Sequence, residues 1–104
     1  MNNLTELDLV HNQIKAIPSN AFKGSNKLRT IHLNENQIST IDDNAFAGLT
    51  NLRGLYLRFN QIKTFSSNAI SGLNSLELLD LQGNPLTKAT KKRLRRKFGD
   101  RVHF

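Results

Sequence analysis

Two acid–histidine combinations in the sequence could do chemistry. One is Asp8 with His32, the other is Asp80 with His103, and the chain repeat described below would place the members of each side by side. A carboxylate beside an imidazole can orient a histidine for proton transfer or metal binding. The chain has no cysteine, and neither combination has a third ligand or a nucleophile nearby. We therefore expect no catalysis, no cofactor, no metal site and no small-molecule substrate. Neighbouring Asp and His side chains would only stabilise the fold, by roughly a few tenths of a kcal/mol per pair.

A second group with chemical potential is the run "KKRLRRKF" at residues 91–98. Eight basic residues and one acid lie between Lys88 and Arg101, whereas the rest of the chain holds seven basic and seven acidic side chains. The net charge of +7 is therefore concentrated at one end of the chain. Charge-driven binding is expected there. The predicted electrostatic patch consists of Lys91, Lys92, Arg93, Arg95, Arg96 and Lys97.

The patch has two interpretations, and the sequence leaves both open. It is either the solvated face of a helix or a site that binds nucleic acid, an anionic membrane surface or an acidic protein. Six like charges within eight residues repel one another, which destabilises a helix and favours a binding role. The absence of aromatic residues among these charges argues against base stacking by single-stranded nucleic acid.

The elements that must position these residues follow from an internal repeat. Apolar residues and an asparagine recur at a constant interval, and "NQI" occurs three times. Four columns of equivalent positions illustrate the interval: Leu4, Leu28, Leu52 and Leu76; Leu7, Ile31, Leu55 and Leu79; Leu9, Leu33, Leu57 and Leu81; Asn12, Asn36, Asn60 and Asn84. One unit cannot bury its own apolar side chains, so stacked units are predicted to share one core.

The segments "LTELDLVHNQI", "LRTIHLNENQI", "LRGLYLRFNQI" and "LELLDLQGNPL" fit the pattern LxxLxLxxNxL. The chain thereby resembles the leucine-rich repeat family over residues 1–86, as four repeats of equal length. The resemblance implies an α/β solenoid, a segment of a horseshoe with a parallel β-sheet on its concave face and an irregular convex side. It also implies protein binding, although the family binds very different partners on one scaffold.

The four repeated asparagines stand where each strand ends and the chain turns. A buried side-chain amide there can bond to backbone groups that no strand satisfies. We therefore predict a structural role for Asn12, Asn36, Asn60 and Asn84.

Residues 87–104 differ from the repeats and are predicted to form a C-terminal cap. Thr87 can begin a helix over about residues 87–98, and Thr90, Leu94 and Phe98 recur on one face of it. Gly99 can end the helix, and alternation in "DRVHF" predicts a terminal strand beside the fourth repeat. This ending resembles the cysteine-free helical caps of some leucine-rich proteins. With no visible signal peptide, it favours the cytoplasm, and an extracellular parent protein stays open.

Side chains on the concave face are expected to be exposed and to vary from repeat to repeat, as a binding surface requires. The predicted protein-binding residues are Asp8, His32, Asn34, Tyr56, Arg58, Phe59 and Asp80, with Gly54 leaving a dip beside Tyr56. Tyr, Arg and Phe are types enriched in interfaces. We predict a non-enzymatic module for protein–protein interaction, whose partner the sequence does not name.

Two alternatives to this function stay open. The basic helix could instead be an electrostatic tether to nucleic acid or anionic membrane, or the chain could be a fragment that terminates a longer repeat array. The first unit has no polar cap before it, so self-association through that end is a further expectation.

Overall fold

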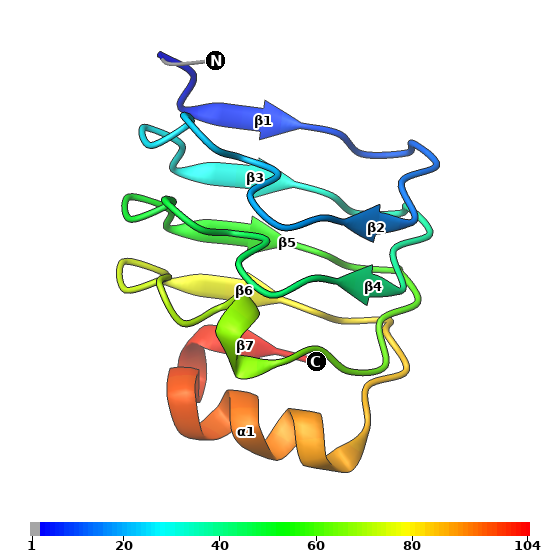
Figure 1. The fold of residues 1–104 in the computed structure, drawn as a ribbon. Coiled ribbons are helices and arrows are strands. Elements are labelled where there is room, and N and C mark those ends of the chain that lie inside the picture. The colour runs from blue at the N-terminus through cyan, green and yellow to red at the C-terminus, as the bar shows by residue number, and fades with distance from the viewer. Residues whose placement is uncertain (1–2) are drawn as a thin grey trace.

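In the computed structural model, which describes residues 3–104, the chain winds through four stacked turns, forms a helix below them and ends in a strand beside the fourth turn (Figure 1). Five short parallel strands line one side of the stack. In spatial order they are β1 (Glu6–Asp8), β3 (Thr30–His32), β5 (Gly54–Tyr56), β6 (Leu78–Asp80) and β7 (Val102–His103). The predicted parallel sheet, with the chain's last strand beside that of the fourth repeat, is confirmed.

The register of the sheet follows the repeat period. Leu7 pairs with Ile31, Ile31 with Leu55 and Leu55 with Leu79, so each step along the sheet is one full repeat. The last step is one residue shorter, because Leu79 pairs with Val102. Equivalent residues of successive repeats therefore stand side by side on the sheet.

The core lies behind the sheet and consists of the same columns of apolar residues. Leu28, Leu52 and Leu76 are at most 1% exposed, and so are the following two columns from Ile31 and Leu33 onward. The first repeat differs, because Leu4, Leu7, Leu9 and Ile14 are only partly buried. Burying a Leu or Ile side chain fully contributes about 1.5–3 kcal/mol, so the inner repeats gain more from the core than the first one does.

The repeated asparagine links each repeat to the one before it. The Asn60 amide nitrogen donates to Leu57 O of its own repeat at 3.1 Å and to Leu33 O of the previous repeat at 3.0 Å. The Asn60 carbonyl oxygen accepts a bond from the backbone N–H of Ile38 at 3.0 Å. Asn36 and Asn84 make the equivalent bonds. Asn12 bonds only within its own repeat and is exposed, whereas its burial was expected.

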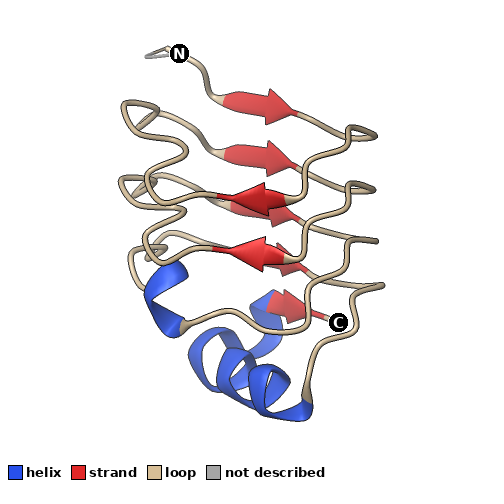
Figure 2. Ribbon diagram, turned by 45° about the vertical axis from the view of Figure 1, so that its right-hand side comes forward, coloured by secondary structure: helices blue, strands red, loops and turns tan. Residues whose placement is uncertain are grey.

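The convex side is more regular than predicted over its first two turns. There β2 (Ala16–Ile17) and β4 (Thr40–Ile41) form a second, two-stranded parallel sheet, seen in front in Figure 2. The side chains of Ile17 and Ile41 are buried in the core, and the extended backbones of the two segments pair with each other. Asp42 N donates to Ile17 O at 3.0 Å. The third repeat has a short 3₁₀ helix, η1 (Ser67–Ala69), in the following segment.

The cap helix, α1 (Lys88–Phe98), begins one residue later than predicted, after Thr87, whose hydroxyl accepts a bond from Thr90 N at 3.2 Å. Its buried face is Thr90, Leu94 and Phe98, as expected, and Leu94 and Phe98 belong to the core of the repeats. Gly99, with φ of +56°, ends the helix, and η2 (Gly99–Arg101) leads into β7. The boundary between residues 86 and 87 stays a prediction. Among residues 3–104 there is no helix with both the length and the apolar character needed to cross a membrane.

Replacing Asn60 by Ala should lower the free energy of unfolding by about 2–3 kcal/mol, because it leaves the N–H of Ile38 buried without a partner and removes one of the two side-chain donors to Leu33 O and to Leu57 O. The matched control is Asn12→Ala, which removes only exposed bonds and should cost less than about 1 kcal/mol. Urea denaturation measures both. Equal losses in the two variants would contradict the role assigned to the inter-repeat bonds.

Ser25 stands where Leu49 and Leu73 stand in later repeats. It is 0% exposed, and its hydroxyl has no hydrogen-bond partner among the described residues. Ser25→Ala should therefore raise the free energy of unfolding by about 1 kcal/mol, since an unpaired buried hydroxyl is costly. Ser75→Ala, which removes a bond to Thr50 O at 2.7 Å, should bring no such gain. A Ser25→Ala variant less stable than the parent in the same urea titration would refute this interpretation.

Candidate functional site

The central ladder of the sheet face brings together the side chains that the sequence singled out. Strand pairing places Asp8, His32, Tyr56, Asp80 and His103 next to one another in that order. The rings of His32 and Tyr56 stack, with centroids 4.9 Å apart and planes 7° from parallel. These two rings form a flat platform in the middle of the sheet.

The predicted neighbours Asp8–His32 and Asp80–His103 do lie side by side on paired strands, but neither aspartate bonds to its histidine. His32 Nε2 lies 2.9 Å from Glu6 Oε2, not from Asp8. An Asp8 oxygen instead accepts the N–H of Val10 at 3.1 Å, since the short aspartate side chain bonds to the turn that follows its own strand. Asp80 does the same with Gln82 N at 3.2 Å, and His103 has no ion pair among the described residues.

No group of three or more His, Cys, Asp or Glu side chains that could hold a metal ion is found within residues 3–104.

Asp80 was expected to be exposed but is only 8% exposed. Its Oδ2 lies 3.6 Å from Arg58 Nε, an ion pair too long to be a hydrogen bond. The carboxylate therefore holds Arg58 in place and is largely hidden from a partner. Asn34 supports the same residue, because its side-chain oxygen accepts the Arg58 backbone N–H at 2.7 Å.

The dip expected at Gly54 is already filled. A Cβ atom at Gly54 would lie 3.2 Å from Cε2 of Tyr56, so the tyrosine ring occupies the space beside the glycine. Gly54 thus lets Tyr56 lie close to the sheet, and the concave face has no cavity at this point for a partner's side chain.

Beyond the strands, one rim position in each repeat has a left-handed backbone. It is occupied by His11, Glu35, Phe59 and Gly83, with φ of 61°, 60°, 58° and 78°. Phe59 is the single large apolar side chain that is exposed among the described residues, at 53%.

Two neighbours fix the Phe59 ring. The Arg58 guanidinium lies 5.3 Å from its centroid, and a Cβ at Gly83 would come within 2.5 Å of Phe59 Cδ1. The ring therefore rests on the backbone of the next repeat. Sequence reasoning included Phe59 but missed its dependence on Gly83, for which the glycine at the equivalent rim position is the available signal.

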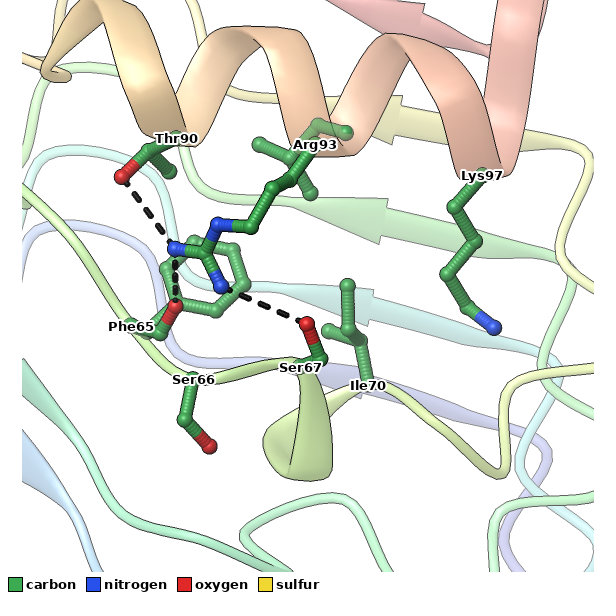
Figure 3. A pocket seen from close by; sticks show the side chains of 8 residues that line it. Phe65, Ser66, Ser67, Ile70, Thr90, Arg93 and Lys97 are labelled. Atoms are coloured by element: carbon green, nitrogen blue, oxygen red, sulfur yellow. Dashed lines mark hydrogen bonds between the residues drawn. The ribbon is translucent and has the colours of Figure 1, made fainter.

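The structure divides the predicted electrostatic patch. Arg93 faces a shallow pocket between α1 and η1, where its guanidinium donates to Phe65 O at 2.9 Å and to Ser67 Oγ at 3.3 Å (Figure 3). Lys97 lines the same pocket without a hydrogen bond to these residues. Arg93 therefore ties the cap to the third repeat, a structural role that its place in a run of charges did not indicate.

Other cations of the helix surround aromatic rings. Arg95 Cζ and Lys91 Nζ lie 4.9 Å and 5.9 Å from the ring centroid of Phe104, and Lys97 Nζ lies 5.7 Å from that of Phe98. Lys92 and Arg96 are exposed and make no hydrogen bond, ion pair or ring contact with the described part of the chain. The six residues of the predicted electrostatic patch thus lie in several different environments.

The model of the leucine-rich repeat family matches residues 2–62 and 40–86 of the sequence. The chain belongs to the leucine-rich repeat family. Family members are generally protein-interaction modules, and the solenoid with its parallel sheet is the family's architecture. A comparison with curated proteins finds no match to this leucine-rich repeat chain.

Solved leucine-rich repeat structures superpose well on this one. They include a Leptospira interrogans leucine-rich repeat protein (TM-score 0.84, 28% identity, 98% of this chain and 26% of that one) and TLR13 in complex with ssRNA13 (0.82, 37%, 86% and 13%). Drosophila Toll in the Toll–Spatzle complex is also similar (0.74, 28%, 80% and 13%). This leucine-rich repeat chain thus spans about a quarter or less of the length of these relatives.

The role of Arg93 can be tested against its neighbour in the same run. Arg93→Ala should lower the free energy of unfolding by about 1–2 kcal/mol, because bonds from a charged donor to Phe65 O and Ser67 are lost. Arg96→Ala, without such contacts, should stay within about 0.5 kcal/mol of the parent. Thermal and urea unfolding provide the measurement. Indistinguishable stabilities would show that Arg93 is not a tie between cap and repeats.

Proposed function

We propose that this leucine-rich repeat protein recognises another protein through the concave sheet face and its rim, with Phe59 as the principal contact. Toll, one of the similar structures, is seen in a complex with Spatzle. That likeness supports recognition of a partner in general terms, and the residues of this chain support the position of the contact.

The observation that carries the proposal is the exposed, left-handed Phe59. An L-residue in that conformation costs roughly 1–2 kcal/mol relative to its usual backbone regions, and a bulky side chain there is uncommon. Gly83 shows that the same turn accommodates a residue without a side chain. A phenylalanine that is 53% exposed gains little from the core in return. Strain kept at an exposed aromatic side chain favours a function in binding.

The surroundings of Phe59 favour tight recognition because they are already ordered. Arg58 and Gly83 hold the ring, Asp80 and Asn34 hold Arg58, and the His32–Tyr56 stack forms a flat surface in the adjoining strands. A partner that binds rigid aromatic and guanidinium groups loses little side-chain entropy at the interface. Asp8, exposed at the far strand, belongs to the periphery of this surface.

Photo-crosslinking tests where the partner binds. The photoreactive residue p-benzoylphenylalanine at position 59 should form an adduct with one predominant protein in cells that express the chain. The control position is Asn44, which is exposed and also has a left-handed backbone (φ 61°). It follows β4 on the convex side, opposite the five-stranded sheet. An adduct at 44 but not at 59, or the same adducts at both, would overturn the proposal.

With the crosslinked partner purified, Phe59→Asn should weaken binding at least about 10-fold, as loss of a central aromatic contact does. Asparagine tolerates the left-handed backbone, so stability should stay within about 1 kcal/mol of the parent. His11→Asn, which introduces the same residue at the equivalent rim position of the first repeat, is the control and should change affinity less than about 2-fold. Calorimetric titration compares the two. Equal effects of both exchanges would argue against Phe59 as the centre.

A further inference from the structure

The cations of the cap are not neutralised by the protein. None of the basic side chains of α1 lies within 4.0 Å of a carboxylate in residues 3–104, where the ion pairs are His11–Glu35, His32–Glu6 and Arg58–Asp80. Like charges four residues apart on a helix destabilise it by about 0.2–0.5 kcal/mol per pair. Ion pairing within the chain therefore does not explain why these positions are basic.

The structure also separates cations that stabilise the cap from cations that do not. Arg93 is bound to Phe65 O and Ser67, and Arg101 donates to Leu76 O at 3.0 Å. Lys88, Lys92 and Arg96 are exposed and form no side-chain contact of these kinds within the described chain.

These three residues form a single row along the outer side of α1, opposite the buried Leu94. Their spacing of four residues puts successive charges about 6 Å apart along the helix axis. Such a row presents its charges to a polyanion that runs along the helix.

A membrane is the less suitable anionic partner. Helices that bind membrane interfaces insert an apolar face into the lipid. The apolar face of α1 is occupied, because Thr90, Leu94 and Phe98 are 1%, 2% and 3% exposed within the core of the solenoid. The row of charges is therefore suited to a soluble polyanion.

Beside the row, Arg95 and Phe104 form a pair of planar groups on which a nucleic-acid base could stack. The fold returns Phe104 to the helix, and the Arg95 guanidinium lies 4.9 Å from the centroid of that half-buried ring. Unpaired bases stack on aromatic rings and on arginine planes. The sequence-based argument against base stacking considered only aromatic residues within the run of charges, whereas Phe104 lies outside that run in sequence and beside Arg95 in space.

We propose that this surface, made of Lys88, Lys92 and Arg96 together with the Arg95–Phe104 pair, binds single-stranded nucleic acid. The row contacts successive phosphates, and one base stacks on the Arg95–Phe104 pair. The site is separate from the concave face, so it adds a second function to the protein recognition proposed above.

The test uses the whole chain and a fluorescein-labelled oligo(dT) of about 16 nucleotides, followed by fluorescence anisotropy. Three phosphate contacts, one from each residue of the row, predict that log K falls against log salt concentration with a slope of about −2. The double variant Lys92→Gln/Arg96→Gln should bind at least about 10-fold more weakly and reduce the slope by about 1.4. The control Lys15→Gln/Lys23→Gln removes the same charge from the first turn and should change affinity less than about 2-fold.

Stacking of a base at position 104 is measured separately, by tryptophan fluorescence. The chain has no tryptophan, so Phe104→Trp introduces a single reporter. Its emission should be quenched by oligo(dT) and left unchanged by heparin, which carries anionic charge but no bases. The proposal is overturned by an equal loss in both double variants, by absence of quenching, by quenching with heparin, or by tighter binding to phosphatidylserine vesicles than to oligo(dT). A lack of binding at about 0.15 M salt would overturn it as well.

Discussion

The bond between a side-chain amide and two successive turns of backbone is the interaction on which this fold depends. Each parallel strand is only two or three residues long, so the chain leaves the sheet with carbonyl and N–H groups that no neighbouring strand satisfies. Asn36, Asn60 and Asn84 each donate to a carbonyl of their own repeat and to one of the preceding repeat, and accept an N–H from the preceding repeat. The apolar columns then stay aligned, and residues on the sheet face stand in fixed rows.

The sequence predicts whatever depends on position within the repeat. The strand pairing, the buried columns, the inward face of α1 and the final strand could all be anticipated, because a constant repeat length places equivalent side chains next to each other. The ladder from Asp8 to Asp80 follows from this regularity, and His103 joins it although the last step is one residue shorter.

What the sequence could not predict depends on the length and direction of individual side chains. Glu6, not Asp8, reaches His32, because aspartate bonds to its own turn. The burial of Asp80 depends on Arg58, and the filled space at Gly54 depends on the direction of the Tyr56 ring. Arg93 and Phe104 were misjudged because their neighbours come from other parts of the chain.

The first repeat has a consequence for how the molecule moves. Its leucines are half-buried and Asn12 lacks the bonds that join two repeats, whereas the other end is closed by α1. In a stack whose layers touch only their neighbours, resistance to local opening rises inward from a weak end. In this 104-residue chain, thermal fraying should begin near Leu4 and decrease before it reaches the third turn. Tyr56, Arg58 and Phe59 thus lie in the part of the molecule that resists local opening, where unfolding of the first turn does not displace them.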